Sequence, residues 1–280
     1  MRTPSLPSLL VTDWHVEPGV LAQAALCCLL YLLAVRRARG DWPRLRTLSF
    51  LTGVAAVVLA VCSGIDGYDD RLLSVHMVQH MILLLCAPLL LLIGRPVLLA
   101  LKALPRRDRP KLARALRRGR AITGPLPCLA VFYSAVLVTH LPSFYDAALT
   151  HPALHTAEHG LYLLAGLMLW WPLLDGEPVP TRRLSGLGRL IYLIVAMLPM
   201  ALVGAYLNRH TTVIYSAYAA PSRALSVNPL RDQAQAGAIM WVLGDVIMVA
   251  GGLCAALRAL VAEERRQQLR DARALSGGLR

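Results

Sequence analysis

Charged residues are scarce in this sequence of 280 residues, in which Asp, Glu, Lys and Arg together make up only 16%. A soluble domain of this length usually contains more charged and fewer apolar residues. Here 56% of the residues are apolar and the mean hydropathy is +0.54. This composition is sufficient for about seven membrane spans of roughly 20 residues each. It argues against a soluble enzyme, a disordered chain and a disulfide-rich secreted domain.

Motifs for catalysis and cofactor binding are also missing. The sequence has no nucleophile–base spacing, no phosphate-binding loop and no cofactor fingerprint, so we do not expect an enzyme. The six cysteines form no C-x-x-C pair, which argues against a zinc ribbon or a disulfide framework. The only lysines, Lys102 and Lys111, lie between apolar runs. A retinal protein is therefore excluded, because it needs a lysine within its last span.

Seven long apolar runs predict an all-α polytopic membrane protein, built as a bundle of seven transmembrane helices. Residues 1–257 are expected to form this transmembrane domain, and 258–280 a charged cytoplasmic tail that continues the last helix. Pro88 and Pro199 fall inside spans and predict local kinks, which membrane helices tolerate. The expected spans are about 19–35, 47–64, 74–94, 125–141, 153–174, 188–207 and 234–257.

The basic residues are distributed unequally among the connections between these runs. Of the 29 Lys and Arg residues, 24 lie in the four segments 36–46, 95–120, 175–189 and 258–280. The positive-inside rule places these segments in the cytoplasm and the N-terminus outside. The net charge of +13 then indicates loops that face anionic lipid, and no nucleic-acid partner is expected. The long outer connection 208–233 could fold over the helix ends as a lid.

Two pairs of histidines have the spacing of metal ligands. His76 and His80 lie at the start of the third span, and His155 and His159 at the start of the fifth. Residues four apart lie on one helix face, about 6 Å from each other, so both rings of a pair can reach one ion. Two such faces at matched depth predict one metal site with four imidazoles. All histidines fall on the predicted outer side or in the outer parts of spans: His15, His76, His80, His140, His151, His155, His159 and His210.

Imidazole suits copper, zinc, nickel and iron, and softer ligands shift the preference toward Cu(I). Met77 and Met81 flank the first histidine pair, so we expect copper. Glu158 could orient an imidazole or be a paired carboxylate near the interface. Asp245, near the bilayer midplane, should have either a function or a hydrogen-bonding partner. We expect the additional ligands, or the groups that orient ligands, among His151, His140, Met77, Met81, Glu158, Asp232 and Asp245.

Four blocks follow one another between about residues 70 and 257: HMVQHMILLLCAPLLLLIGRP, HPALHTAEHGLYLLAGLMLWWPL, LIYLIVAMLPMALVGAYL and DQAQAGAIMWVLGD. They resemble the CtaG family of multi-span bacterial cytochrome c oxidase assembly proteins, which was first linked to the caa-type oxidase. Family members carry a second Gln after the DQ pair, where this sequence has Ala234. The motif positions that the resemblance implies are His76, His80, His155, His159, Asp232 and Gln233.

The resemblance further implies a seven-span protein of the bacterial plasma membrane that matures a haem–copper oxidase by handling copper. Its partners would be oxidase subunits or other assembly factors. Two other functions stay open. A b-type haem or electron-transfer protein would use one histidine of each pair as an axial ligand, although the pairs supply twice the ligands that one haem needs. A copper or cation transporter would use Asp245 as a deeper step, although the cytoplasmic half offers few further ligands.

Overall fold

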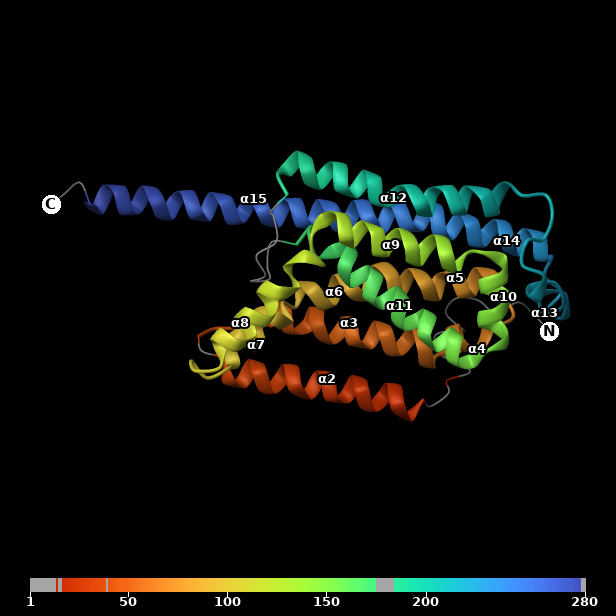
Figure 1. Cartoon of the computed structure of the whole chain (residues 1–280), viewed down its shortest axis with the longest axis horizontal. Coiled ribbons are helices and arrows are strands. Elements are labelled where there is room, and N and C mark those ends of the chain that lie inside the picture. Colours follow the sequence, from red (N-terminus) through yellow and green to blue (C-terminus); the bar gives the residue numbers. More distant parts are fainter. Residues whose placement is uncertain (1–13, 15–16, 39, 175–183, 278–280) are drawn as a thin grey trace.

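In the computed structural model, which describes residues 14, 17–38, 40–174 and 184–277, every regular element is a helix. The long helices run side by side along one axis, and shorter helices lie at their ends (Figure 1). His15 and residues 175–183 of one predicted cytoplasmic loop lie outside the described residues. The elements are α2 (Pro18–Arg37), α3 (Arg44–Cys62), α4 (Gly64–Tyr68), α5 (Leu73–Met81), η1 (Ile82–Cys86), α6 (Ala87–Ile93), α7 (Pro96–Ala103), α8 (Arg109–Arg118), η2 (Gly119–Ala121), α9 (Pro125–Thr139), α10 (Pro142–Thr150), α11 (Pro152–Trp170), α12 (Gly186–Arg209), η3 (Ser216–Tyr218), α13 (Ala219–Ala224), α14 (Pro229–Ala238), η4 (Ile239–Leu243) and α15 (Gly244–Gly277).

Each predicted span corresponds to one helix or to helices in direct succession, so the chain is a multi-pass membrane protein. Helices α9 and α10 are long and apolar enough to cross a membrane only when they are taken together, and they are bent by 75° relative to each other. If this bent pair counts as one span, the described residues contain six candidate spans, and otherwise five. Helix α11 is not a candidate span by length and apolar composition, because its first half contains the polar residues His155, Glu158 and His159. The number seven therefore stays a prediction. Five segments are long and apolar enough by themselves: Pro18–Arg37, Arg44–Tyr68, Leu73–Ala103, Gly186–Arg209 and Pro229–Leu257.

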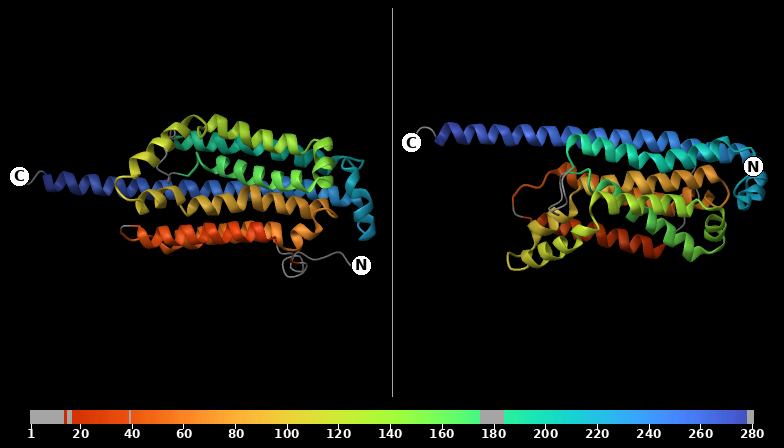
Figure 2. Two further views of the ribbon diagram at one scale, coloured as in Figure 1. Left: turned by 60° about the horizontal axis from the view of Figure 1, so that its bottom comes forward. Right: turned by 45° about the horizontal axis from the view of Figure 1, so that its top comes forward.

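The C-terminal tail continues the last span without a break. Helix α15 extends from Gly244 to Gly277, and its last part projects beyond the bundle at the end where α7 and α8 lie (Figure 2). The predicted helical continuation over 258–275 is thus present. The basic segment 95–120 and residues 258–277 of the basic tail consequently lie at one end of the molecule, as the positive-inside argument requires of two cytoplasmic segments.

Two of the spans contain a π-helical turn, η1 between α5 and α6 and η4 between α14 and α15. Pro88 follows η1 and has no N–H to donate to the carbonyl of Leu84, four residues earlier. The indole of Trp170 in α11 donates to the neighbouring carbonyl of Leu85 at 3.0 Å. The irregularity predicted near Pro88 is therefore a π turn, and the adjacent helix satisfies part of its backbone. Pro199, in contrast, lies within the continuous helix α12.

Glycines allow close backbone contact between helices at two places. A Cβ atom on Gly166 of α11 would lie 2.0 Å from the carbonyl oxygen of Leu84. A Cβ atom on Gly237 of α14 would lie 2.4 Å from the carbonyl oxygen of Gly204 in α12, and 2.6 Å from the backbone nitrogen of Asn208. Small residues at helix interfaces are typical of membrane bundles, because they let backbones approach closely. These contacts fix α11 and α14 against their neighbours.

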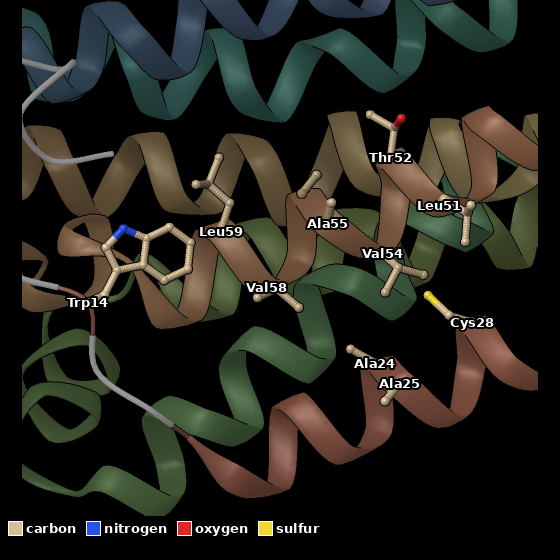
Figure 3. A pocket seen from close by; sticks show the side chains of 11 residues that line it. Trp14, Ala24, Ala25, Cys28, Leu51, Thr52, Val54, Ala55, Val58 and Leu59 are labelled. Carbon is tan, nitrogen blue, oxygen red and sulfur yellow. The ribbon is translucent and has the colours of Figure 1, made fainter. Parts of the chain in front are cut away.

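An apolar cleft of about 580 Å³ opens between α2 and α3 (Figure 3). Helix α2 has Tyr31 as its only buried residue, which suits a helix that faces lipid. The hydroxyl of Tyr31 donates to the carbonyl of Gly94 at 2.7 Å, and its ring stacks on Phe50. None of the seven described histidines lines this cleft. Its lining residues include Trp14, Ala24, Cys28, Val54, Val58 and Leu59.

The contact between α12 and α14 gives the first testable prediction. We expect Gly237→Ala to lower the free energy of unfolding by about 1–3 kcal/mol, because the methyl group would overlap backbone atoms that cannot move aside. The measurement is thermal unfolding of the detergent-solubilised protein. Gly160→Ala is the matched control, because a Cβ atom there meets nothing within 4 Å. Equal stability of the two variants would contradict the close packing of α12 on α14.

Candidate metal centre

Helices α5 and α11 begin at the same end of the bundle, near α4, α10 and α13 (Figure 1). Within each helix the two histidine rings are close, with centroids 4.1 Å apart for His76 and His80 and 4.3 Å apart for His155 and His159. Between the helices, the centroids of His76 and His155 are 5.4 Å apart, and those of His80 and His159 are 6.4 Å apart. The structure thus brings together the four histidines that the spacing singled out.

Several polar atoms of this cluster are buried without a partner. His76 and His80 are 1% and 0% exposed. Among the described residues, no hydrogen bond reaches Nε2 of His76, either ring nitrogen of His80, or Nε2 of His155. Buried polar atoms in proteins are nearly always hydrogen-bonded, and a cluster of exceptions indicates a group that binds there.

Two carboxylates lie among the imidazoles. Oδ2 of Asp69 is 3.3 Å from Nε2 of His155, and Oε1 of Glu158 is 3.8 Å from Nε2 of His80. Both carboxylate oxygens are buried and accept no hydrogen bond from the described residues. Burial, and after it the charge of Asp66, raises the pKa of Asp69 to about 8. A bound cation would favour the charged form of this carboxylate.

The potential ligands form two overlapping groups. Ligand atoms of Asp69, His155 and His159 all lie within 4.8 Å of one another, and so do those of His76, His155 and Glu158. His155 belongs to both groups, whereas His80 belongs to neither. The four imidazoles therefore do not surround a single point, as one four-imidazole site would require.

Neighbouring side chains orient the rings. The hydroxyl of Tyr218 lies 3.0 Å from Nδ1 of His76 and donates to the carbonyl of Asp69 at 2.7 Å. Oε1 of Gln79 lies 3.1 Å from Nε2 of His159. The ring of Tyr162 stacks on His80 with centroids 4.1 Å apart. These contacts hold the imidazoles in place, as the groups around metal-binding histidines do.

Asp232 does not reach the histidines but holds the start of their helix. Its carboxylate accepts hydrogen bonds from the backbone N–H of Leu73 at 2.7 Å and of Ser74 at 3.3 Å, and from the Ser74 hydroxyl at 2.5 Å. These N–H groups belong to the first turn of α5 and have no partner within their own helix. Asp232 therefore caps the helix that carries His76 and His80.

Gln233, the next residue, fixes the connection that covers the cluster. Its Oε1 accepts from the N–H of Ile214 at 2.7 Å, and its Nε2 donates to the carbonyl of Thr212 at 3.1 Å. This segment continues to Tyr215 and then to Tyr218, and both side chains are buried. The hydroxyl of Tyr215 donates to the carbonyl of His140 at 2.9 Å. Part of the 208–233 connection thus lies against the cluster, as expected of a lid.

His140 and His151 differ in their relation to the cluster. His140 is buried, its Nδ1 lies 2.7 Å from the carbonyl oxygen of Val136, and its ring centroid is 6.5 Å from that of His80. His151 is the residue before the first turn of α11, as Pro152 predicted. Its ring is exposed, with Nδ1 3.0 Å from the carbonyl oxygen of Ala147. His140 borders the cluster, and His151 lies outside it.

The remaining three candidates are Met77, Met81 and Asp245. Met77 and Met81 are buried in the apolar core of the bundle, in the same cluster as Tyr145, Tyr162 and Tyr218. Asp245 lies in the first turn of α15, and its Oδ1 is buried and accepts no hydrogen bond from the described residues. Asp245 belongs to neither of the two ligand groups.

Sequence reasoning missed Asp69, Gln79 and Tyr218 as residues of the centre. Two of them carried a local signal, because Asp69 lies in the acidic GIDGYDD segment just before α5 and Gln79 lies between the paired histidines. Tyr218 had none, since it is separated from His76 by 142 residues.

The chain matches the protein family described as cytochrome c oxidase caa3 assembly factor over residues 29–261. Relatives include uncharacterized proteins of Mycobacterium bovis and Mycobacterium tuberculosis, each 31% identical, and one of Mycobacterium leprae, 28% identical. These alignments cover 93–94% of this chain but 41% of each relative, so the chain spans about two fifths of their length. No solved structure matches it.

The cap on α5 yields a prediction about stability. We expect Asp232→Ala to lower the free energy of unfolding by about 1–2 kcal/mol, because the first turn of α5 loses its acceptors. Hydrogen exchange of residues 73–81 in detergent should become faster, while that of α12 should not change. Asp232→Asn keeps an acceptor oxygen and should lose less stability. Unchanged exchange in α5 of the alanine variant would show that the cap is unimportant.

Proposed function

This chain belongs to the family of cytochrome c oxidase caa3 assembly factors, and from that premise we propose that it binds copper as cargo and supplies it to a haem–copper oxidase during assembly. The copper would be bound within the cluster that the facing histidine pairs form, by His76, His155 and His159 together with Asp69 and Glu158, and His80 would lie beside it. The observation that carries the proposal is the set of buried ring nitrogens without hydrogen bonds. A bound ion would supply the partner that these atoms lack.

The chemistry of the cluster supports Cu(I) as the ion. Neutral imidazole is a good copper ligand. Burying a monovalent ion costs less free energy than burying a divalent one, and Asp69 and Glu158 provide negative charge to compensate for it. Thioether ligands do not contribute to this argument, because Met77 and Met81 lie in the apolar core.

The position of the cluster supports delivery on the extracytoplasmic side. The cluster lies at the end of the bundle opposite α7, α8 and the end of α15, which contain the basic segments (Figures 1 and 2). We propose that α9 and α11 also span the bilayer, which gives seven spans with the N-terminus outside and the C-terminus in the cytoplasm. The membrane is then the bacterial plasma membrane, where the oxidase is assembled.

The packing of the rings favours copper over the two alternatives. A haem would need a planar space beside its axial ligand, but His80 is already packed against His76 and Tyr162, with centroids 4.1 Å away in each case. A transporter would need ligands that continue toward the cytoplasm. Asp245, the candidate for that step, belongs to no group of potential ligands among the described residues.

Removing one histidine of each pair tests the proposal. We expect the purified protein to contain copper without a Soret band. The double variant His76→Ala and His159→Ala, which removes one histidine from each ligand group, should lose the bound copper and, in cells, lower the copper content and activity of the oxidase by about tenfold or more. The matched control is His151→Ala, because that ring is exposed and outside the cluster. Oxidase copper that stays normal in the double variant would overturn the proposal, and a Soret band would favour haem.

The orientation has its own test. Alkaline phosphatase, which is active only outside the cytoplasm, should be active when fused after residue 225 and inactive when fused after residue 110 or residue 277. The basic composition of 95–120 and 258–280 is the reason for this expectation. The reverse pattern would place the histidine cluster on the cytoplasmic side.

A further inference from the structure

The two ligand groups at the cluster differ in depth. The outer group, Asp69, His155 and His159, contains the two half-buried histidines. The inner group adds His76 and Glu158 to the shared His155, and both added residues are at most 2% exposed. The carboxylates of the two groups are almost equally buried, with Asp69 3% and Glu158 2% exposed, so the difference lies in the histidines. His159, which only the outer group contains, is half-buried, whereas His76, which only the inner group contains, is 1% exposed.

We propose that these groups are two alternative positions for one ion, and that the ion moves between them while His155 stays bound to it. This inference rests on the proposed function and deepens it. When the ion moves from the outer to the inner position, it exchanges the ligands Asp69 and His159 for Glu158 and His76. Because His155 stays bound, the ion is never without a ligand inside the protein. Two ions at once are disfavoured, because like charges repel strongly at the short distances that a shared ligand imposes.

Each position contains one carboxylate, which explains why both acids are buried at this end of the bundle. A monovalent cation bound by one carboxylate and two neutral imidazoles carries no net charge. Neutral complexes lose less solvation energy on burial than charged ones. Oδ2 of Asp69 and Oε1 of Glu158 are both buried and accept no hydrogen bond from the described residues, so each is available to an ion.

The surroundings give the two positions different stability. In the outer group, Nε2 of His159 lies 3.1 Å from Oε1 of Gln79, so an ion bound through this nitrogen would displace that contact. In the inner group, Nε2 of His76 is unpartnered among the described residues, and its Nδ1 is held by Tyr218. The outer position therefore suits entry and release, and the inner position suits storage.

The two carboxylates should then affect different measurements. With the full-length protein in detergent, Cu(I) is supplied from a coloured Cu(I) chelator, and both the loading rate and the equilibrium competition are recorded. We expect Asp69→Asn to slow loading by about tenfold or more, with a smaller change in affinity. We expect Glu158→Gln to weaken affinity by about tenfold or more while the loading rate stays within a factor of about two. His155→Ala should impair both.

The control for Asp69→Asn is Asp70→Asn, which removes the same charge one residue later from an exposed side chain. Thermal unfolding of each variant shows whether it is folded. Equal effects of Asp69→Asn and Glu158→Gln on both rate and affinity would overturn the two-position inference and indicate one common site. Wild-type protein that binds no Cu(I) would instead overturn the proposed function itself, so the two failures are distinguishable.

Discussion

The carboxylate of Asp232 is the contact on which the metal centre depends most. It connects two helices that are about 160 residues apart in sequence, through the first turn of α5 on one side and α14 on the other. Next to it, Gln233 fixes the segment that leads to Tyr215 and Tyr218. One short motif in the last span therefore sets the position of the first histidine pair and of the cover above it. Asp232 and Gln233 thus have a structural role in the cluster without contacting an ion directly.

Burying a group of unsatisfied imidazoles costs stability, and the rest of the bundle must offset that cost. Close helix contacts at Gly166 and Gly237 contribute packing energy that larger residues at these positions would prevent. The π turns η1 and η4 lie directly after the segments that carry the site, in α5 and α14. Such turns frequently accompany functional sites, because they change the register of a helix locally without ending it. The regular part of the bundle thus supports the end that contains the unsatisfied imidazoles.

The sequence predicts the helices and the two histidine pairs well, because both follow from local periodicity. Met77 and Met81 stay a prediction as additional ligands, and the same local geometry separates them from the histidine face. Each follows a histidine by one position, which rotates it by about 100° around the helix axis and directs it into the apolar core. Helical spacing relates the two methionines to each other but not to the histidine face. Tyr218 and Asp69 reach the centre through contacts between distant segments, which no periodicity encodes.

Access to the centre from one end only is consistent with assembly and does not favour transport. The exposed fraction falls from the side chain of His155 to that of His80, which is fully buried. Beneath His80 the described residues form an apolar core that includes Met81, Leu84 and Trp170. An ion that enters past His155 meets no further imidazole or carboxylate in that core, which favours exit by the same route. A site of this kind can hold an ion and return it to a partner on the same side of the membrane, which is the task of a factor that loads another protein.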